Sequence, residues 1–136
     1  MKEPSAARKR TLELHNRAIR FSTAVNRAYP REQMNYPSEI VWNQLVRAAD
    51  SASNNLVEAG NGSTDPDFLH KMRIALRETK ESKTCLHKIS AADLHSAARV
   101  REMKLEQEAD ELAAIFATII INMERRLAQQ PPRARR

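Results

Sequence analysis

Apolar residues recur every three or four positions along most of the chain, which is the spacing expected of amphipathic helices. The first stretch predicts a helix from about Ser5 to Tyr29. Pro30 ends this helix, because the residue before a proline avoids the helical conformation. The buried stripe of the helix would consist of Leu14, Ala18, Phe21, Val25 and Ala28.

A second helix is predicted from Ser38 to Ala59, since the same apolar spacing resumes after a short linker. Ser38 is a good N-cap, because a serine side chain accepts a hydrogen bond from the first turn. The Gly-Asn-Gly sequence at residues 60–62 would supply the left-handed conformations that end a helix.

Two further helices complete the pattern. The third is predicted to open with Asp65 as N-cap and Pro66 in its first turn, and to reach Ile89. After a turn, Ser96 is expected to cap a fourth helix that runs to about Gln129.

Four long helices with short connections predict an all-α fold, an antiparallel up-down-up-down four-helix bundle. We expect one domain over residues 1–130, followed by a disordered basic tail at residues 131–136. The chain has only two glycines, fewer than strands joined by tight turns would need. In such a bundle, the start of the first helix and the end of the fourth lie at the same end of the molecule.

The composition predicts a cytoplasmic location. Cys85 is the single cysteine, so no internal disulfide can form, which suits a reducing compartment. The first residues lack the apolar core of a signal peptide. The longest apolar run, at residues 113–121, is too short for a bilayer, which takes about 20 residues. We therefore expect no membrane partner.

Positive charge is concentrated at the two ends of the sequence. Residues 1–31 carry eight Lys or Arg against two Glu, and residues 125–136 carry five Arg and no acid. Residues 32–124, by contrast, carry ten basic and fifteen acidic groups. The predicted topology would join both ends into one basic pole, which is typical of a surface for nucleic acid. A solvated helix face with a basic tail explains the same charges, and this alternative stays open.

The candidate nucleic-acid contacts are the Lys and Arg side chains of these two ends. Aromatic residues make up only 4% of the chain and none lies among the basic clusters, so phosphate contacts are expected in preference to base stacking. The predicted contact residues are Arg8, Lys9, Arg10, Arg17, Arg20, Arg27, Arg125, Arg126, Arg133, Arg135 and Arg136.

The fourth predicted helix is apolar on more than one side, which indicates burial on a second face. At the helical period, Ala114, Ala117 and Ile121 fall away from its inner stripe. Trp42 and Val46 likewise flank the stripe of the second helix. These five residues are predicted to form a homo-oligomer interface. Scattered surface apolar residues are the alternative, and they are common in monomers.

Polar residues lie on or beside the facing stripes of the second and third helices. Because buried polar groups need partners, we expect a hydrogen-bonded structural layer that fixes the register of the two helices. An active site built from Asn55, Glu58 and Glu81 is the enzymatic alternative. The predicted layer consists of Asn55, Glu58, Thr79, Glu81 and Ser82.

Neither a metal site nor a cofactor site is expected. A di-iron bundle needs Glu-x-x-His pairs, and no Glu in the chain has a His three residues later. Cys85 and His87 alone are too few ligands for zinc. The four histidines lie beside no obvious nucleophile, so no enzymatic activity is expected.

One combination of residues is characteristic of a known family: Ser51, Asn55, Glu58, Ala59, Ser63, Asp67, Phe68, Ile74, Ala75, Glu78, Glu81 and Leu86, with Leu12, Leu14 and Ala18 in the first helix. With these residues, the chain from Leu12 to about Leu127 resembles the four-helix-bundle family of 23S ribosomal-RNA intervening-sequence proteins. Relatives of the accessory protein of diversity-generating retroelements belong to the same family. The chain departs from the family pattern at His15, where a Trp is typical, at Cys85, where an aromatic residue is frequent, and at residues 92–94, which replace a glycine-containing turn.

The resemblance implies a helical bundle that assembles as a homopentamer and has no enzymatic activity. For the retroelement members it implies binding to nucleic acid and to a reverse transcriptase. The leading hypothesis is therefore an oligomeric scaffold that binds nucleic acid, with structured RNA as the favoured ligand. The alternative is an adaptor that docks an acidic protein partner, such as a reverse transcriptase, without nucleic acid.

Overall fold

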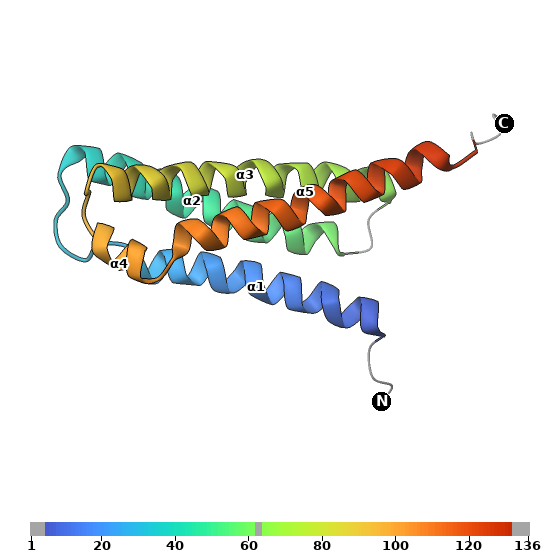
Figure 1. The fold of residues 1–136 in the computed structure, drawn as a ribbon, viewed down its shortest axis with the longest axis horizontal. Helices are drawn as coiled ribbons and strands as arrows, with labels where there is room; N and C mark the ends of the chain where they lie inside the picture. The colour runs from blue at the N-terminus through green and yellow to red at the C-terminus, as the bar shows by residue number, and fades with distance from the viewer. Residues whose placement is uncertain (1–4, 62–63, 132–136) are drawn as a thin grey trace.

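The computed structural model describes residues 5–61 and 64–131, and within these ranges the chain is helical with no strand. The predicted all-α class is confirmed. Pro131 is the only residue of the predicted tail within the described ranges. The helices are α1 (Ala6–Ala28), α2 (Tyr36–Ala59), α3 (Asp65–Ala91), α4 (Ala97–Glu102) and α5 (Leu105–Gln129) (Figure 1).

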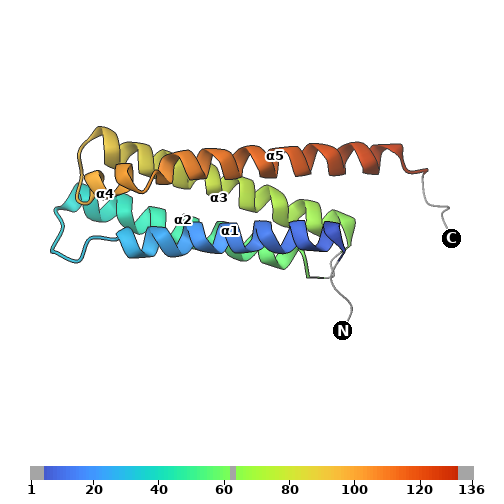
Figure 2. The ribbon, with the colours of Figure 1, turned by 60° about the horizontal axis from the view of Figure 1, so that its bottom comes forward.

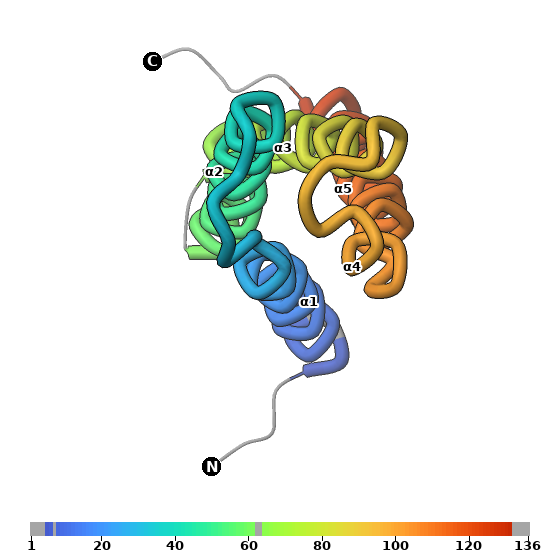
Figure 3. Tube along the Cα trace, turned by 90° about the vertical axis from the view of Figure 1, so that its left-hand side faces the viewer, coloured from blue at the N-terminus to red at the C-terminus, as the bar shows by residue number. Residues whose placement is uncertain are grey.

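The four long helices run along the length of the molecule, and the short α4 lies at the end where α1 leads into α2 (Figures 1 and 2). α2 packs most extensively against α3, α3 against α5, and α1 against α2. α1 and α5 share the least contact of the neighbouring long helices, and the view along the axis shows α1 set apart from α5 (Figure 3). Within the described ranges, no helix is long and apolar enough to cross a membrane.

The core is built from the predicted apolar stripes, and Trp42 belongs to it near the end of the molecule where α1 leads into α2. The Trp42 side chain is fully buried, its Nε1 donates a hydrogen bond to the carbonyl oxygen of His95 at 2.8 Å, and its ring meets that of Tyr29 edge-on. Trp42 therefore has no surface to offer to a neighbouring chain, which corrects its predicted place at an oligomer interface. The bond to the His95 carbonyl allows the indole to be buried, because a buried donor needs a partner.

The N-caps of α2 and α3 differ from those predicted. α2 begins two residues earlier, at Tyr36, because Asn35 caps it: the Asn35 side chain accepts a hydrogen bond from the Ser38 backbone N–H at 3.0 Å. The Ser38 hydroxyl instead accepts from the backbone N–H of His95, which ties α2 to the turn before α4. Thr64, in place of Asp65, caps α3.

Gly60 ends α2 without the left-handed conformation that we predicted. Its φ of −81° is one that any residue adopts. The reason for a glycine is space, because a Cβ on Gly60 would lie 2.8 Å from Cε1 of His15 in α1. The other predicted left-handed glycine, Gly62, lies outside the described residues.

The single fourth helix that we predicted is divided into α4 and α5. Lys104, between them, has a φ of 54°, and Ser96, before α4, has a φ of 64°. Ser96 thus does not act as the predicted N-cap, since its side chain makes no capping hydrogen bond. The apolar pattern gives no sign of the break, because Val100 and Leu105 are buried on either side of it.

Candidate nucleic-acid interface

The positive charges of α1 lie largely on one edge of the helix. Arg10, Arg17, Arg20 and Arg27 fall within about a third of the helix circumference at 3.6 residues per turn. This edge faces α5, because Arg17 binds carboxylates of that helix. The spacing of these arginines brings them together as a row along α1.

Arg17 is neutralised by two glutamates of α5. Its Nε lies 2.9 Å from Glu108 Oε2, and one terminal nitrogen lies 2.6 Å from Glu108 Oε1 and 2.9 Å from Glu111 Oε2. The fork on Glu108 is the two-point geometry that suits a guanidinium and a carboxylate. Arg17, a predicted phosphate contact, therefore serves as the tie between α1 and α5.

The contact between Arg17 and Glu108 shifts the pKa of each residue toward its charged form. The hydrogen bond to Glu108 is the main cause that raises the pKa of Arg17. The same hydrogen bond holds the pKa of Glu108 below its ordinary 4.5. Both groups are therefore charged near neutral pH.

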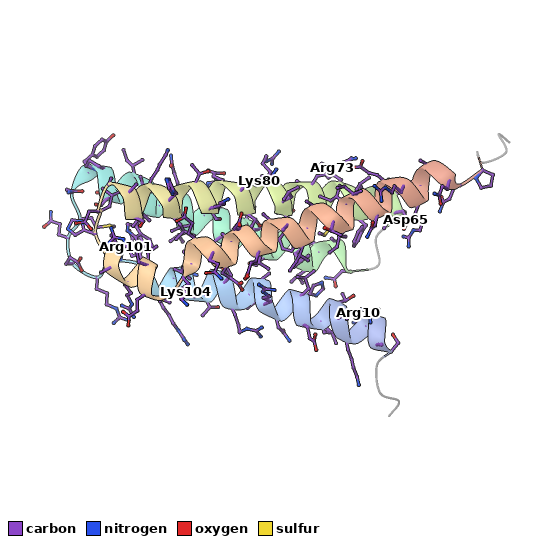
Figure 4. The ribbon with its side chains drawn as sticks, viewed as in Figure 1. Arg10, Asp65, Arg73, Lys80, Arg101 and Lys104 are labelled. Atoms are coloured by element: carbon purple, nitrogen blue, oxygen red, sulfur yellow. The ribbon has the colours of Figure 1, made fainter. Side chains whose placement is uncertain are left out.

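Arg10, Arg20 and Arg27 lie outside the ion pairs of the described residues, although the charge of Arg20 contributes to the lowered pKa of Glu108. Each of the three residues is exposed, and none makes an ion pair with a described residue. Lys104 joins them at the start of α5, because Lys104 and Arg20 line the same surface pocket of about 310 Å³. We call the four residues Arg10, Arg20, Arg27 and Lys104 the basic edge. Figure 4 labels Arg10 near the start of α1 and Lys104 where α4 meets α5.

Several cations elsewhere in the described part of the chain are paired. Arg47 binds Glu78 and Glu81, Lys71 binds Glu58, and further pairs link α3 to α5. These further pairs are Arg73 with Glu124, Lys83 with Asp110 and Arg126 with Asp65. The net positive field is therefore expected to be strongest along α1.

The predicted basic pole is only partly assembled. Arg8 and Arg10, at the start of α1, and Arg125, near the end of α5, lie at the same end of the molecule, but the two helix ends stand apart there (Figures 1 and 2). Arg126 is paired with Asp65 at 3.7 Å. Lys9 is exposed on α1. The predicted contacts Arg133, Arg135 and Arg136 lie outside the described residues.

The predicted polar layer does not form as a network between α2 and α3. Thr79 and Ser82 are buried, but each hydroxyl donates to a carbonyl of its own helix, at Ala75 and Glu78. Asn55 bonds within α2 to Ser51. The polar link between the two helices is made by ion pairs instead, Glu58 with Lys71 and Glu81 with Arg47. The side chains of Asn55, Glu58 and Glu81 thus turn to separate partners.

The other residues predicted at an oligomer interface keep some exposure. Ile121 is 48% exposed, Ala114 is exposed, and Val46 and Ala117 are half-buried. Two exposed apolar residues of α1, Leu12 at 39% and Ile19 at 46%, were not predicted. Their spacing of seven residues was the available signal, since it puts both on the outer face of α1.

Lys104 is a further candidate that sequence reasoning missed. It lies in residues 32–124, where acidic groups outnumber basic ones, and only the turn between α4 and α5 brings it beside Arg20.

Comparison with known proteins identifies a family. Residues 10–118 match the family described as 23S rRNA-intervening sequence protein. At the threshold used, no curated protein and no solved structure matches the chain.

Proposed function

The chain belongs to the family of 23S rRNA-intervening sequence proteins, and on that premise we propose that it is a non-enzymatic protein that binds nucleic acid through the basic edge. Structured RNA is the proposed ligand. The observation that carries the proposal is that the four exposed cations of the basic edge make no ion pair with a described residue, whereas ion pairs link several cations of α3 and α5 to carboxylates.

The geometry of the basic edge suits a phosphate backbone. Arg10 and Arg27 are separated by about 25 Å along the helix axis, which is long enough to follow several phosphates of one strand. Phe21 lines the pocket beside Arg20 and Lys104 but is buried, so the contact would be to phosphates and carry little base specificity. The family name refers to an intervening sequence of 23S rRNA, which supports RNA as the ligand.

We propose that the fold is an up-down-up-down bundle of α1, α2, α3 and α5, with α4 as an added turn.

We further propose that the chain self-associates, as a homopentamer. The support is two exposed apolar strips on different helices, Leu12 with Ile19 on α1 and Ala114 with Ile121 on α5. When one strip of a subunit packs against the other strip of the next subunit, the contact is head-to-tail, and such contacts can close into a ring. Ile121→Glu should then lower the mass of the assembly in solution.

The test of RNA binding is a titration of a fluorescent hairpin RNA from about 50 to about 200 mM salt. A phosphate-contacting surface predicts binding that weakens steeply as salt rises, because each contact releases counterions. Replacing Arg27 and Lys104 together by Glu should weaken binding by about tenfold or more and lower the salt slope by about one per contact.

The matched control replaces Lys80 and Lys88 by Glu, which changes the net charge equally on α3. Both residues are exposed and lie off the basic edge. Equal losses in the two double variants would overturn the assignment to the basic edge. Absence of binding at about 50 mM salt would overturn nucleic acid as the ligand and favour docking of an acidic protein.

A further inference from the structure

A groove of about 700 Å³ lies between α1 and α5, on the side of the molecule where the long helices contact one another least. Leu14 of α1 and Ile115 and Ile119 of α5 line it, and all three are half-buried against the core. The groove is open to solvent. Its floor is therefore an apolar surface that the chain itself leaves partly uncovered.

The ion pairs between Arg17 and α5 determine where the groove lies. Arg17 holds α1 to Glu108 and Glu111 of α5. α1 and α5 run in opposite directions, so Leu14 and Arg10 lie further toward the end that carries the termini, as do Ile115 and Ile119. The helices separate toward that end in Figure 1.

The rim of the groove is mostly basic. Arg10, Arg17 and Arg20 line it along α1, with one acid, Glu13. Since Arg17 is already paired with α5, Arg10 and Arg20 supply the remaining positive charge of the rim, which exceeds the one negative charge of Glu13. An apolar floor with a positively charged rim complements an amphipathic helix that carries Asp or Glu beside its apolar stripe.

We propose that this groove docks an acidic amphipathic helix of a partner protein. Ile115 and Ile119, one helical turn apart, would receive apolar side chains spaced by three or four residues, as in other helix-in-groove complexes. Arg10 and Arg20 would pair with the flanking carboxylates. An open groove suits a helix better than a small molecule, because small-molecule sites enclose most of their ligand. The site goes beyond RNA binding and does not depend on it.

The probe is a fluorescent acidic peptide of about 18 residues, with Leu at helical spacing on one face and Glu flanking it, long enough to form a helix alone. A peptide with Lys in place of Glu is its control. Binding of the acidic peptide, with much weaker binding of the basic one, is the expected result. The unaltered protein with isotope-labelled isoleucine methyl groups should show shifts at Ile115 and Ile119 and none at Ile40. Ile40 is a half-exposed residue on α2, outside the groove.

The decisive variant is Ile119→Ser, with Ile40→Ser as the matched control. Ile119→Ser should weaken peptide binding by about tenfold, since it removes apolar area from the floor. Ile40→Ser should leave peptide binding unchanged. Failure of the acidic peptide to bind, or equal binding by both variants, would overturn the proposal. Methyl shifts on the unaltered protein would still locate the site if Ile119→Ser did not fold.

Two further readouts separate this proposal from the others. Arg27→Glu should weaken RNA binding and spare the peptide, whereas Ile119→Ser should weaken the peptide and spare RNA. Either proposal can therefore fail alone. If Ile119→Ser lowers the mass of the protein in solution, a second copy of the chain occupies the groove, and the partner-helix proposal is wrong.

Discussion

Gly60, at the end of α2, leaves room for the ring of His15 in α1. Gly60 has an ordinary helical φ of −81°, so its backbone would accept alanine. The imidazole of His15 fills the space where a Cβ would lie, 2.8 Å from its Cε1. Burial, and to a lesser extent the charge of Arg8, lowers the pKa of His15 from its ordinary 6.5. The ring therefore packs at this contact mostly as the neutral form.

A double-mutant cycle tests this contact. Gly60→Ala alone should destabilise the protein by about 1 kcal/mol, because the ring of His15 must move. With His15 already replaced by Ala, the same change should stabilise by about 0.4–1 kcal/mol, because alanine reduces the freedom of the unfolded chain. Urea unfolding of the four proteins measures the coupling. An identical effect of Gly60→Ala in both backgrounds would contradict the assigned role of His15.

At the scale of elements, two left-handed residues isolate α4 from its neighbours. Ser96 precedes α4 with a φ of 64°, and Lys104 follows it with a φ of 54°. A left-handed conformation costs a non-glycine residue about 1–2 kcal/mol. Neither side chain makes a capping hydrogen bond to offset that cost.

Ser96→Gly should therefore stabilise the protein by about 1 kcal/mol, seen as a rise in the thermal unfolding midpoint. Lys80→Gly, at an exposed position in the interior of α3, is the control, because glycine in a helix interior should destabilise by about 1 kcal/mol. A lower midpoint for Ser96→Gly would show that the hydroxyl has a role that its hydrogen bonds do not reveal.

The positions of the helices were predictable where a single local signal determined them. The residues at which the helices begin and end were not. The apolar repeat located the stripes of α1, α2 and α3, since their buried residues recur every three or four positions among polar ones. The start of α2 depended on a choice between two good caps, Asn35 and Ser38, only one of which faces the first turn. The break at Lys104 has no glycine to mark it.

The candidate site was predictable only in part, for a related reason. The helical period places Arg10, Arg20 and Arg27 on one edge from sequence alone. Which arginines stay unpaired depends on distant residues: Glu108 lies 91 positions from Arg17 in the sequence. Charge counts by segment cannot resolve such pairs.

At the scale of the whole molecule, α1 is held in place by groups that respond to acid. The folded-state pKa of Glu108 is lowered by Arg17, and that of His15 is lowered by burial. In both cases the unfolded state binds more protons over the affected range, so stability falls as pH falls. The stability associated with neutral His15 is lost as the pH falls below about 6.5, its ordinary pKa. The stability associated with ionised Glu108 is lost as the pH falls below about 4.5.

The free energy of unfolding should therefore decline between about pH 7 and pH 3, with the Glu108 pair contributing about 1 kcal/mol. Glu108→Gln should be less stable at pH 7 and should lose less on going from pH 5 to pH 3. Urea titrations at several pH values check this. Parallel pH profiles for the two proteins would show that the tie to Arg17 does not stabilise α1.

The unequal packing of α1 has a consequence for how the chain folds. α2 and α3 are consecutive in sequence, end and begin within a few residues of each other, and share the most extensive contact. Contacts between neighbours in sequence form with little loss of loop entropy, so this hairpin is expected to be the earliest unit to fold. α1 makes its link to α5 across most of the chain and is expected to exchange its amide hydrogens first. The helix that carries the basic edge would thus be the last to dock and the first to open.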